Sequence, residues 1–459
     1  MTSSAQSVVR NPDFVKLWTA ETISQFGTQV SLLALPLVAV ALLQATPFEV
    51  AMLGTIEFLP FILFSLPAGA WVDRLRRRPI LIAGDIGRAL VLISIPVAYV
   101  LGVLTIWQMF VVGFVAGTLT VFFDVAYQSY LPSLVDRDQL VDGNGKLEIS
   151  RTVAQTAGPA IGGGLIGFLT APFAIVIDSI SYAFSALFVF LIRKPEPTPD
   201  RHIDEHGAPR EGLRSEVAKG LRYVLGNEYL RGIAASTGTS NLFTNIALST
   251  FIVYAVRELD MTAAQIGIVF GLGNIGALVG AVTADRVRRW LGLGPTIVWS
   301  MFINAPGFIL IAIAPKEAPI PFLVASGFLG GFSAVVYNIN QVSFRQAITP
   351  TAMQGRMNAT MRFIVWGTIP IGSIIGGAIA TAFSVHTAIW VGALGSFLAV
   401  VPLLITPVRH LREMPAPAGD GETPAGDGET PDRPDGPEPG GPLDDEPSDL
   451  ANVVSGERG

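Results

Sequence analysis

The chain has 459 residues, of which 50% are hydrophobic and only 14% are charged, and its mean hydropathy is +0.52. Soluble globular domains carry charge on about 25% of their residues, so this composition excludes an ordinary soluble protein. Without cysteine, disulfides and thiolate metal sites are excluded, and four scattered histidines argue against zinc, so we expect no metal and no cofactor. The formal charge of −6 combines a basic body with an acidic tail, because 13 acidic residues and two arginines lie from Glu413 onward.

Twelve apolar runs follow one another along the chain. A helix of about 20 apolar residues crosses a ~30 Å hydrocarbon core. The first run follows a weakly basic segment without a small-residue cleavage site, so we interpret it as an uncleaved anchor. The predicted helices cover residues 14–43, 48–71, 79–102, 105–130, 148–170 and 172–192, then 229–257, 262–284, 294–314, 320–346, 358–382 and 386–407.

Lysine and arginine are concentrated in alternate loops. The loops after the second, fourth, eighth and tenth helices and the segment after the sixth are basic, whereas the loops near 44–47, 103–105 and 170–172 hold no Lys or Arg. Cytoplasmic loops collect these residues, so we expect a multi-pass membrane protein with both termini in the cytoplasm.

Two polar regions interrupt and end this pattern. Arg193 to Tyr229 begins as a Pro-rich linker and becomes a charged amphipathic stretch, which we expect on the membrane surface. Near the end, PAGDGET occurs twice in an acidic, Pro- and Gly-rich tail, for which we predict disorder. The predicted domains are an N-terminus (1–13), a six-helix bundle (14–192), a cytoplasmic linker (193–228), a second six-helix bundle (229–407) and a disordered cytoplasmic tail (408–459).

The two sets of six helices repeat each other. VDRLRRR at Val72 recurs as ADRVRRW, which places Asp73 and Asp285 212 residues apart. IGGG recurs in weaker form as IIGG, with Gly163 and Gly376 213 residues apart. We therefore predict an all-α polytopic membrane protein, with twelve transmembrane helices in two pseudo-symmetric six-helix bundles.

The loop between the second and third helices resembles that of the major facilitator superfamily, and the resemblance extends from Phe14 to Pro407. The family has a Gly before its basic pair, where this chain has Arg76. At the end of a helix, Asp73 can meet arginines and a helix N-terminus and so lock the halves together; the alternative is simple anchoring by arginines, which does not need Asp73. The predicted cytoplasmic gate comprises Gly69, Asp73, Arg74, Arg77 and Arg78, joined by Asp124, Asp285 and Arg286.

The fifth helix contains AGPAIGGGL, which resembles the antiporter motif of drug-exporting major facilitators. The matching residues are Gly158, Pro159, Gly162 and Gly163, whereas Ala154 replaces the first Gly of the family pattern. Proline and glycine here permit a bend and close helix contact, although packing by small residues alone is the alternative. Other segments are similar to the bacterial branch that includes macrolide, multidrug and siderophore efflux proteins. The resemblance implies export of a hydrophobic or amphipathic molecule, driven by a proton gradient.

Ionisable residues within the helices are costly, at about 3 kcal/mol each at the bilayer centre, and are therefore functional candidates. Glu21 and Glu57 are the proton-coupling candidates. Asp85 and Arg88 lie three residues apart and are expected to form a structural ion pair, whereas for Asp178 we expect a packing role. Many proton-coupled relatives carry an Arg in the fourth helix; this chain has none there, so that proton route is not implied.

Polar residues on helices that line the superfamily cavity are candidates for substrate binding, although such residues also hold helices together. Competing functions are proton-coupled nutrient uptake, a lipid-modifying membrane enzyme, and a receptor or scaffold. We expect a monomer that is not an enzyme. Its expected partners are a small molecule and the lipid bilayer, without nucleic acid. The sequence contains no Walker motif, so we do not expect ATP to drive it. The cavity candidates are Gln25, Thr28, Asn241, Thr244, Asn245, Tyr337, Asn338 and Gln341.

Overall fold

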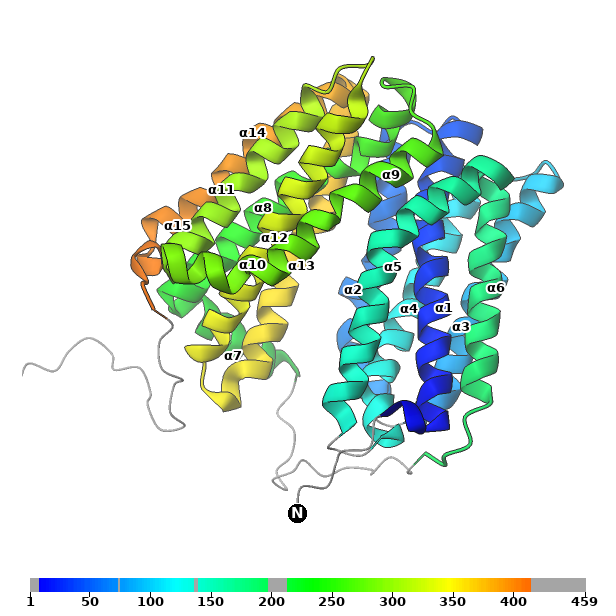
Figure 1. The fold of residues 1–459 in the computed structure, drawn as a ribbon, viewed down its shortest axis with the longest axis horizontal. Coiled ribbons are helices and arrows are strands. Elements are labelled where there is room, and N and C mark those ends of the chain that lie inside the picture. The colour runs from blue at the N-terminus through cyan, green and yellow to red at the C-terminus, as the bar shows by residue number, and fades with distance from the viewer. Residues whose placement is uncertain (1–7, 73–74, 136–138, 197–212, 414–459) are drawn as a thin grey trace, which may run out of the picture. The chain divides into compact units, whose positions relative to one another are not determined.

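The computed structural model describes residues 8–72, 75–135, 139–196 and 213–413, and the chain in these ranges is helical without strands. Asp73, Arg74, the middle of the linker and the tail beyond residue 413 lie outside the described residues. The first six long helices are α1 (Pro12–Leu37, continued by the π-helical η2, Val38–Leu42), α2 (Pro47–Val72), α3 (Arg77–Val100), α4 (Ile106–Leu134), α5 (Leu140–Leu169) and α6 (Ala171–Phe190) (Figure 1).

A second series follows the linker (Figure 1). Within the described residues, eleven segments are long and apolar enough to cross a membrane. Of the twelve predicted transmembrane helices, the one that is not among these segments is α5, whose first half carries several charged side chains. The second series comprises α7 (Leu213–Gly226), α8 (Glu228–Arg257), α9 (Ala263–Gly273), α10 (Ile275–Leu291), α11 (Leu293–Ala312), α12 (Pro319–Ala347), α13 (Thr351–Ala382), α14 (Val385–Ser396), η4 (Phe397–Val400) and α15 (Val401–Ile405).

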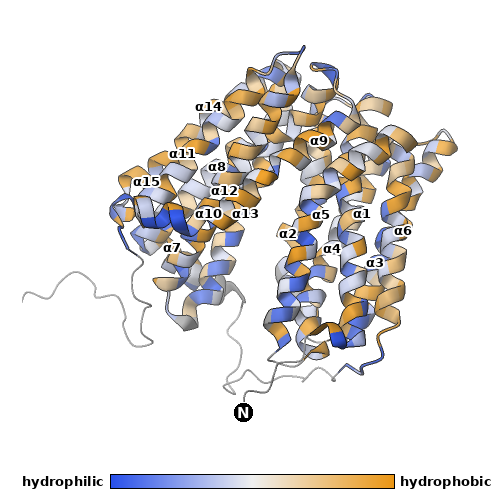
Figure 2. Ribbon diagram, in the orientation of Figure 1, coloured by the Kyte–Doolittle hydropathy of each residue, from blue (hydrophilic) through white to orange (hydrophobic). Residues whose placement is uncertain are grey.

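Because successive spans run in opposite directions, the loops gather at two ends of the molecule. We call the end where α1 turns into α2, at residues 43–46, the far end, and the end where α6 leads into residues 191–196 the linker end. Figure 2 shows that the spans are mainly hydrophobic along their length, with hydrophilic residues gathered towards their ends. This distribution fits helices whose middles lie in hydrocarbon and whose ends lie in water.

Buried apolar side chains form three clusters. The largest combines residues of both halves near the far end, including Val38 and Leu53 from the first half and Phe251 and Ile389 from the second. Two smaller clusters lie at the linker end, and each belongs to one half only. The two halves therefore share a core at the far end and have separate cores at the linker end.

The structure differs from the predicted helices in three places. The eighth predicted span is two helices, α9 and α10, which meet at Asn274, and the twelfth is divided by the 3-10 turn η4. The amphipathic stretch of the linker forms α7, but Gly220 packs against Thr360 of α13, and Val224 is fully buried. The membrane-surface prediction was therefore wrong for this side of α7, which packs on protein.

Candidate functional site

The glycines of α5 form a close contact between the two halves. A Cβ atom added at Gly163 would lie 2.5 Å from the carbonyl oxygen of Ala263 on α9, and Gly267 of α9 packs directly against Pro159 and Gly163. Such a short distance leaves room only for glycine, so the backbones of α5 and α9 touch. One turn further along, the side-chain amide of Asn274 donates to the carbonyl oxygen of Gln155 at 2.5 Å.

A second seam joins α2 to α13. A Cβ atom added at Gly377 would lie 2.6 Å from Cβ of Ala51, and the backbone N–H of Phe48 donates to Oγ1 of Thr381 at 3.2 Å. Nearby, Arg257 at the end of α8 donates to the carbonyl oxygen of Ala45 at 2.8 Å. Both seams join the halves towards the far end.

Equivalent glycines in the two halves have equivalent neighbours, and they correct the predicted register. Gly162 packs within its half against Val30 of α1, and Gly376 packs within its half against Ile246 of α8. Gly163 and Gly377 each face the opposite half. The pairs are thus Gly162 with Gly376 and Gly163 with Gly377, 214 residues apart, so the pairing of Gly163 with Gly376 was wrong by one residue.

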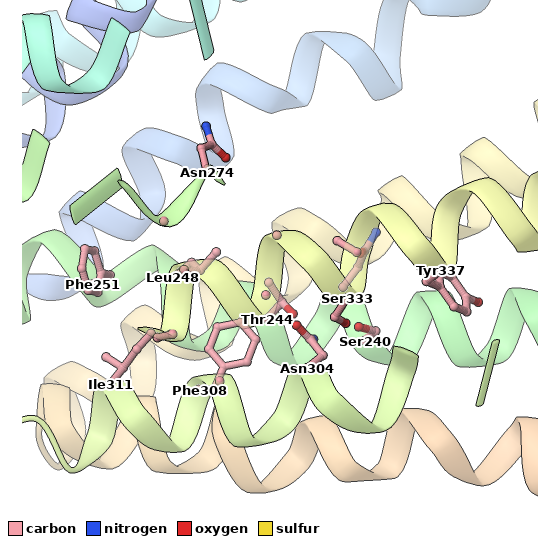
Figure 3. Close-up of a pocket in the computed structure, with 18 of the residues that line it drawn as sticks. Ser240, Thr244, Leu248, Phe251, Asn274, Asn304, Phe308, Ile311, Ser333 and Tyr337 are labelled. Atoms are coloured by element: carbon pink, nitrogen blue, oxygen red, sulfur yellow. The ribbon is translucent and has the colours of Figure 1, made fainter. Parts of the chain in front are cut away.

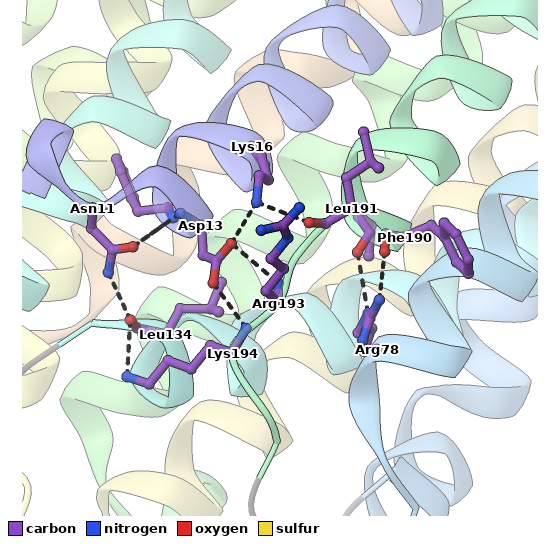
Figure 4. Close-up of polar contacts among 11 residues, drawn as sticks. Asn11, Asp13, Lys16, Arg78, Leu134, Phe190, Leu191, Arg193 and Lys194 are labelled. Atoms are coloured by element: carbon purple, nitrogen blue, oxygen red, sulfur yellow. Dashed lines mark hydrogen bonds and ion pairs between the residues drawn. The ribbon is translucent and has the colours of Figure 1, made fainter.

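The basic pair of the predicted gate binds within its own half. The carboxylate of Glu196 accepts from the backbone N–H groups of Arg77 at 2.6 Å and Arg78 at 3.1 Å, which are the first two residues of α3. The guanidinium of Arg78 donates to the last carbonyl groups of α6, at Val189 and Phe190 (Figure 4). Both contacts satisfy helix ends that would otherwise lack partners.

Arg76, where the related family has a Gly, lies just before α3. Its φ of −68° and ψ of 131° are extended values that any residue adopts, so the backbone of this turn does not require glycine. Figure 4 shows a neighbouring network in which Asp13 accepts from Lys16 and from the backbone N–H groups of Arg193 and Lys194. The polar groups at the linker end of the first half are thus hydrogen-bonded within that half and the first residues of the linker.

Other predicted gate residues lie apart from this network. Gly69 lies near the end of α2. Asp285 is 60% exposed and pairs with Arg288 and Arg289 of its own helix, and Arg286 is exposed. Asp124 was predicted to join the gate, but it has other charged neighbours. Its charged neighbours are Arg88 of α3 and Arg151 of α5, because its side chain faces the interior of the bundle.

Arg88 occupies the interior of the first half, and the predicted pair with Asp85 is present at 2.5 Å. Asp85 is fully buried and Arg88 is 4% exposed. The guanidinium also lies between two rings, 4.2 Å from the centroid of Phe123 and 4.1 Å from that of Tyr182. Glu21 completes this charged cluster. Sequence spacing predicts the pair but not the rings, which come from α4 and α6.

The two proton-coupling candidates lie in different surroundings. Glu21 is 8% exposed; its Oε1 accepts from Gln25 at 2.6 Å, and its Oε2 has no hydrogen-bond partner among the described residues. Glu57 packs against Gly113 of α4, and its Oε1 also lacks a partner in the described part of the chain. Asp178 is buried and accepts from Ser181 at 3.1 Å, as expected for a packing residue.

A cavity of about 470 Å³ lies within the second half, between α8, α9, α11 and α12 (Figure 3). Asn241, Thr244, Tyr337, Asn338 and Gln341 line it, as do residues that the sequence analysis missed, among them Ser240, Asn274, Asn304 and Ser333. Three predicted cavity residues do not line it. Asn245 donates to the backbone of Asn241, Gln25 binds Glu21, and Thr28 lies 2.8 Å from the hydroxyl of Tyr182 within the first half.

Comparison with known proteins gives one family match and several relatives. The family model described as "Transmembrane secretion effector" matches residues 3–421. The chain is 27% identical over 378 residues to the multidrug efflux pump Tap of Mycolicibacterium fortuitum, covering 80% of this chain and 87% of the relative. It is 21% identical over 402 residues to macrolide efflux protein A of Streptococcus pyogenes, covering 87% and 97%.

Solved structures of transporters share the fold at low sequence identity. A bacterial homologue of the iron transporter ferroportin in an inward-facing state superposes with a TM-score of 0.70 at 15% identity, covering 87% of this chain and 99% of that one. The nucleoside transporter NupG superposes with a TM-score of 0.65 at 14% identity, covering 85% and 97%. These likenesses establish the architecture of two six-helix bundles.

Proposed function

Because the chain belongs to the transmembrane secretion effector family of the major facilitator superfamily, we propose that it exports a hydrophobic or amphipathic small molecule in exchange for protons. Two relatives are named for the efflux of drugs and of macrolides, which favours export over uptake. The protein would act as a monomer in a bacterial cytoplasmic membrane, with a small molecule and lipid as its partners and the proton gradient as its driving force. Both termini would lie in the cytoplasm, where the basic linker end fits the charge rule.

The observation that carries the proposal is the contact of Gly163 with α9. This contact sets Pro159 and Gly163 of the predicted antiporter motif against the other half, whereas Gly158 and Gly162 pack against α1 of their own half. Glycine surfaces of this kind let two backbones meet closely. Separation of α5 from α9 would break the hydrogen bond from Asn274 to Gln155. If the termini are cytoplasmic, α5 and α9 close the outer side of the protein while separate cores remain at the inner side.

Glu57 and Glu21 are the proposed proton carriers. Each has a buried oxygen without a hydrogen-bond partner in the described residues, so protonation would remove a charge that no donor stabilises at that atom. Arg88 lies beside Glu21 but is not a neighbour of Glu57, so the two carboxyls would respond differently to substitution. The predicted gate at Asp73 would change its contacts as the linker ends of the halves approach.

Efflux of an apolar fluorescent dye from cells that lack their own pumps tests this proposal. We expect rapid efflux with the wild type, its loss when an uncoupler collapses the proton gradient, and a strong reduction with Glu57→Gln, Glu21→Gln or Asp73→Asn. Glu148→Gln is the matched control, because that carboxylate is 67% exposed. Efflux that persists after the gradient collapses contradicts proton antiport, and proton-driven accumulation of the dye would instead indicate uptake.

A further inference from the structure

The cavity of the second half is apolar at one end and polar at the other. Leu248, Phe251, Phe308 and Ile311 gather at its far end, whereas Ser240, Ser333 and Tyr337 lie towards the linker end, as Figure 3 shows. A volume of about 470 Å³ falls within the range of pockets that hold a small organic molecule, roughly 300–1,000 Å³. This distribution of apolar and polar side chains fits an amphipathic molecule that lies along the helices.

Every lining residue in the described part of the chain is uncharged. Burial of an unpaired ion costs several kcal/mol, so a cationic ligand would need a carboxylate here, and the lining supplies only amides and hydroxyls. Arg345, one turn beyond Gln341 on α12, acts electrostatically on Tyr337 of the lining. Its positive charge opposes a cation further.

One fully buried polar atom of the lining has no hydrogen-bond partner among the described residues. Gln341 is 4% exposed; its Nε2 donates to Oδ1 of Asn338 at 2.9 Å, while its buried Oε1 accepts from no described residue. A buried acceptor without a donor costs about 1–3 kcal/mol. Once the Gln341 side chain turns this oxygen into the cavity, a ligand that brings an N–H or O–H group to it would recover that energy.

We infer that this cavity binds an uncharged amphipathic molecule, which donates a hydrogen bond to Oε1 of Gln341 and places its apolar part between Phe251 and Phe308. The inference rests on the proposed function, because it names the chemical class of the molecule exported. It places the binding site within the second half, since the described lining residues all belong to the segment from α8 to α12.

Calorimetric titration of the purified full-length protein in nanodiscs tests the inference with four naphthyl probes of one skeleton. They are 4-(1-naphthyl)butanamide, its N,N-dimethyl amide, the corresponding carboxylate, and the corresponding ammonium ion. We expect the primary amide to bind at least about tenfold more tightly than each of the others, because it alone is neutral and has N–H donors. Preference for either ion, equal binding of the two amides, or no binding of the primary amide would overturn the inference.

Substitutions locate the site. Gln341→Met removes the acceptor at similar volume and should weaken binding of the primary amide about tenfold, while the dimethyl amide is unaffected. Asn340→Leu is the matched control, because Asn340 is 2% exposed on the same helix but lines a different pocket and donates to Val336. Asn338→Asp should shift the preference towards the ammonium probe. Unchanged binding in Gln341→Met, or no shift in Asn338→Asp, places the probe elsewhere and overturns the inference.

These experiments distinguish failure of the inference about the cavity from failure of the proposed function. If the primary amide binds as expected but dye efflux is absent or independent of the proton gradient, the inference about the cavity stands and the proposed function falls. If efflux is proton-driven but the probe series shows another preference, the proposed function stands and the inference falls.

Discussion

Arg88 of α3 holds the positive charge inside the first bundle. It pairs with Asp85 and lies between the rings of Phe123 and Tyr182, while Glu21 adds negative charge nearby. A buried ion is stable only while its partner remains, whereas removing both members of a pair is often harmless. The cluster therefore predicts strongly coupled effects of substitution.

Arg88→Met should lower the free energy of unfolding by about 3–5 kcal/mol, because Asp85 is left buried without its counter-ion. The double variant Asp85→Asn, Arg88→Met should recover most of this loss. Unfolding of the purified protein in detergent, followed by circular dichroism, measures both. Losses that simply add in the double variant would show that the two residues do not act as a pair.

Glu196→Ala should destabilise the protein by about 1–2 kcal/mol, since its carboxylate caps the N-terminus of α3 and is 4% exposed. Glu148→Ala is the control; its pair with Arg151, at 3.7 Å, is exposed and should contribute under about 1 kcal/mol. Thermal unfolding of the two variants compares them. Equal losses would contradict the capping role of Glu196.

Single residues were predictable where the partner lies on the same helix. The Asp85–Arg88 pair follows from a spacing of three, whereas the neighbours of Asp124 depend on how α3, α4 and α5 are rotated, which the sequence does not reveal. Ser240 and Asn304 were missed as lining residues for the same reason. An isolated serine or asparagine in an apolar helix gives no sign of the direction it faces.

At the scale of elements, most helix ends agree with the prediction within a few residues, but the break between α9 and α10 was missed. The apolar run continues through Asn274, so hydropathy gives no signal there. The available clue was the sequence GLGNIG, since glycine and asparagine disfavour a helix interior. The break brings the side chain of Asn274 to the carbonyl oxygen of Gln155.

Gly163→Ala should impair transport, because the added Cβ atom would push α5 away from α9. Overpacking costs about 1–3 kcal/mol, which is enough to shift a conformational equilibrium about fivefold to 150-fold. Gly164→Ala, where an added Cβ atom meets no described atom within 4 Å, should transport normally. Efflux rates at matched expression decide this point. Equal efflux rates for the Gly163→Ala and Gly164→Ala variants would show that the α5–α9 contact has no role in transport.

At the scale of the molecule, the predicted fold of two six-helix bundles is confirmed. It could be predicted because apolar runs and repeated sequence depend only on the order of residues. The contacts between the halves could not be predicted from such sequence patterns. They depend on three-dimensional packing that joins Gly163 to α9 and Gly377 to α2. The roles assigned to the gate, the carboxyls and the cavity residues stay predictions.

A disulfide across the far end should stop transport. A Cβ atom at Gly271 would lie 3.2 Å from Cβ of Ala160, close to disulfide geometry, and the natural chain has no cysteine to interfere. Ala160→Cys with Gly271→Cys should transport when reduced and fail when oxidised, while each single variant is insensitive to oxidation. Full transport by the oxidised, cross-linked protein would contradict alternating access through separation of α5 from α9.

Proton-driven export is tested most directly in proteoliposomes that carry an imposed pH gradient. An uncharged, non-titratable probe should accumulate in the more acidic compartment, because antiport couples its movement to protons leaving that compartment, whichever way the protein is inserted. The accumulation should disappear with Glu57→Gln. Accumulation in the more alkaline compartment would indicate proton-coupled uptake, and no response to the gradient would contradict proton coupling altogether.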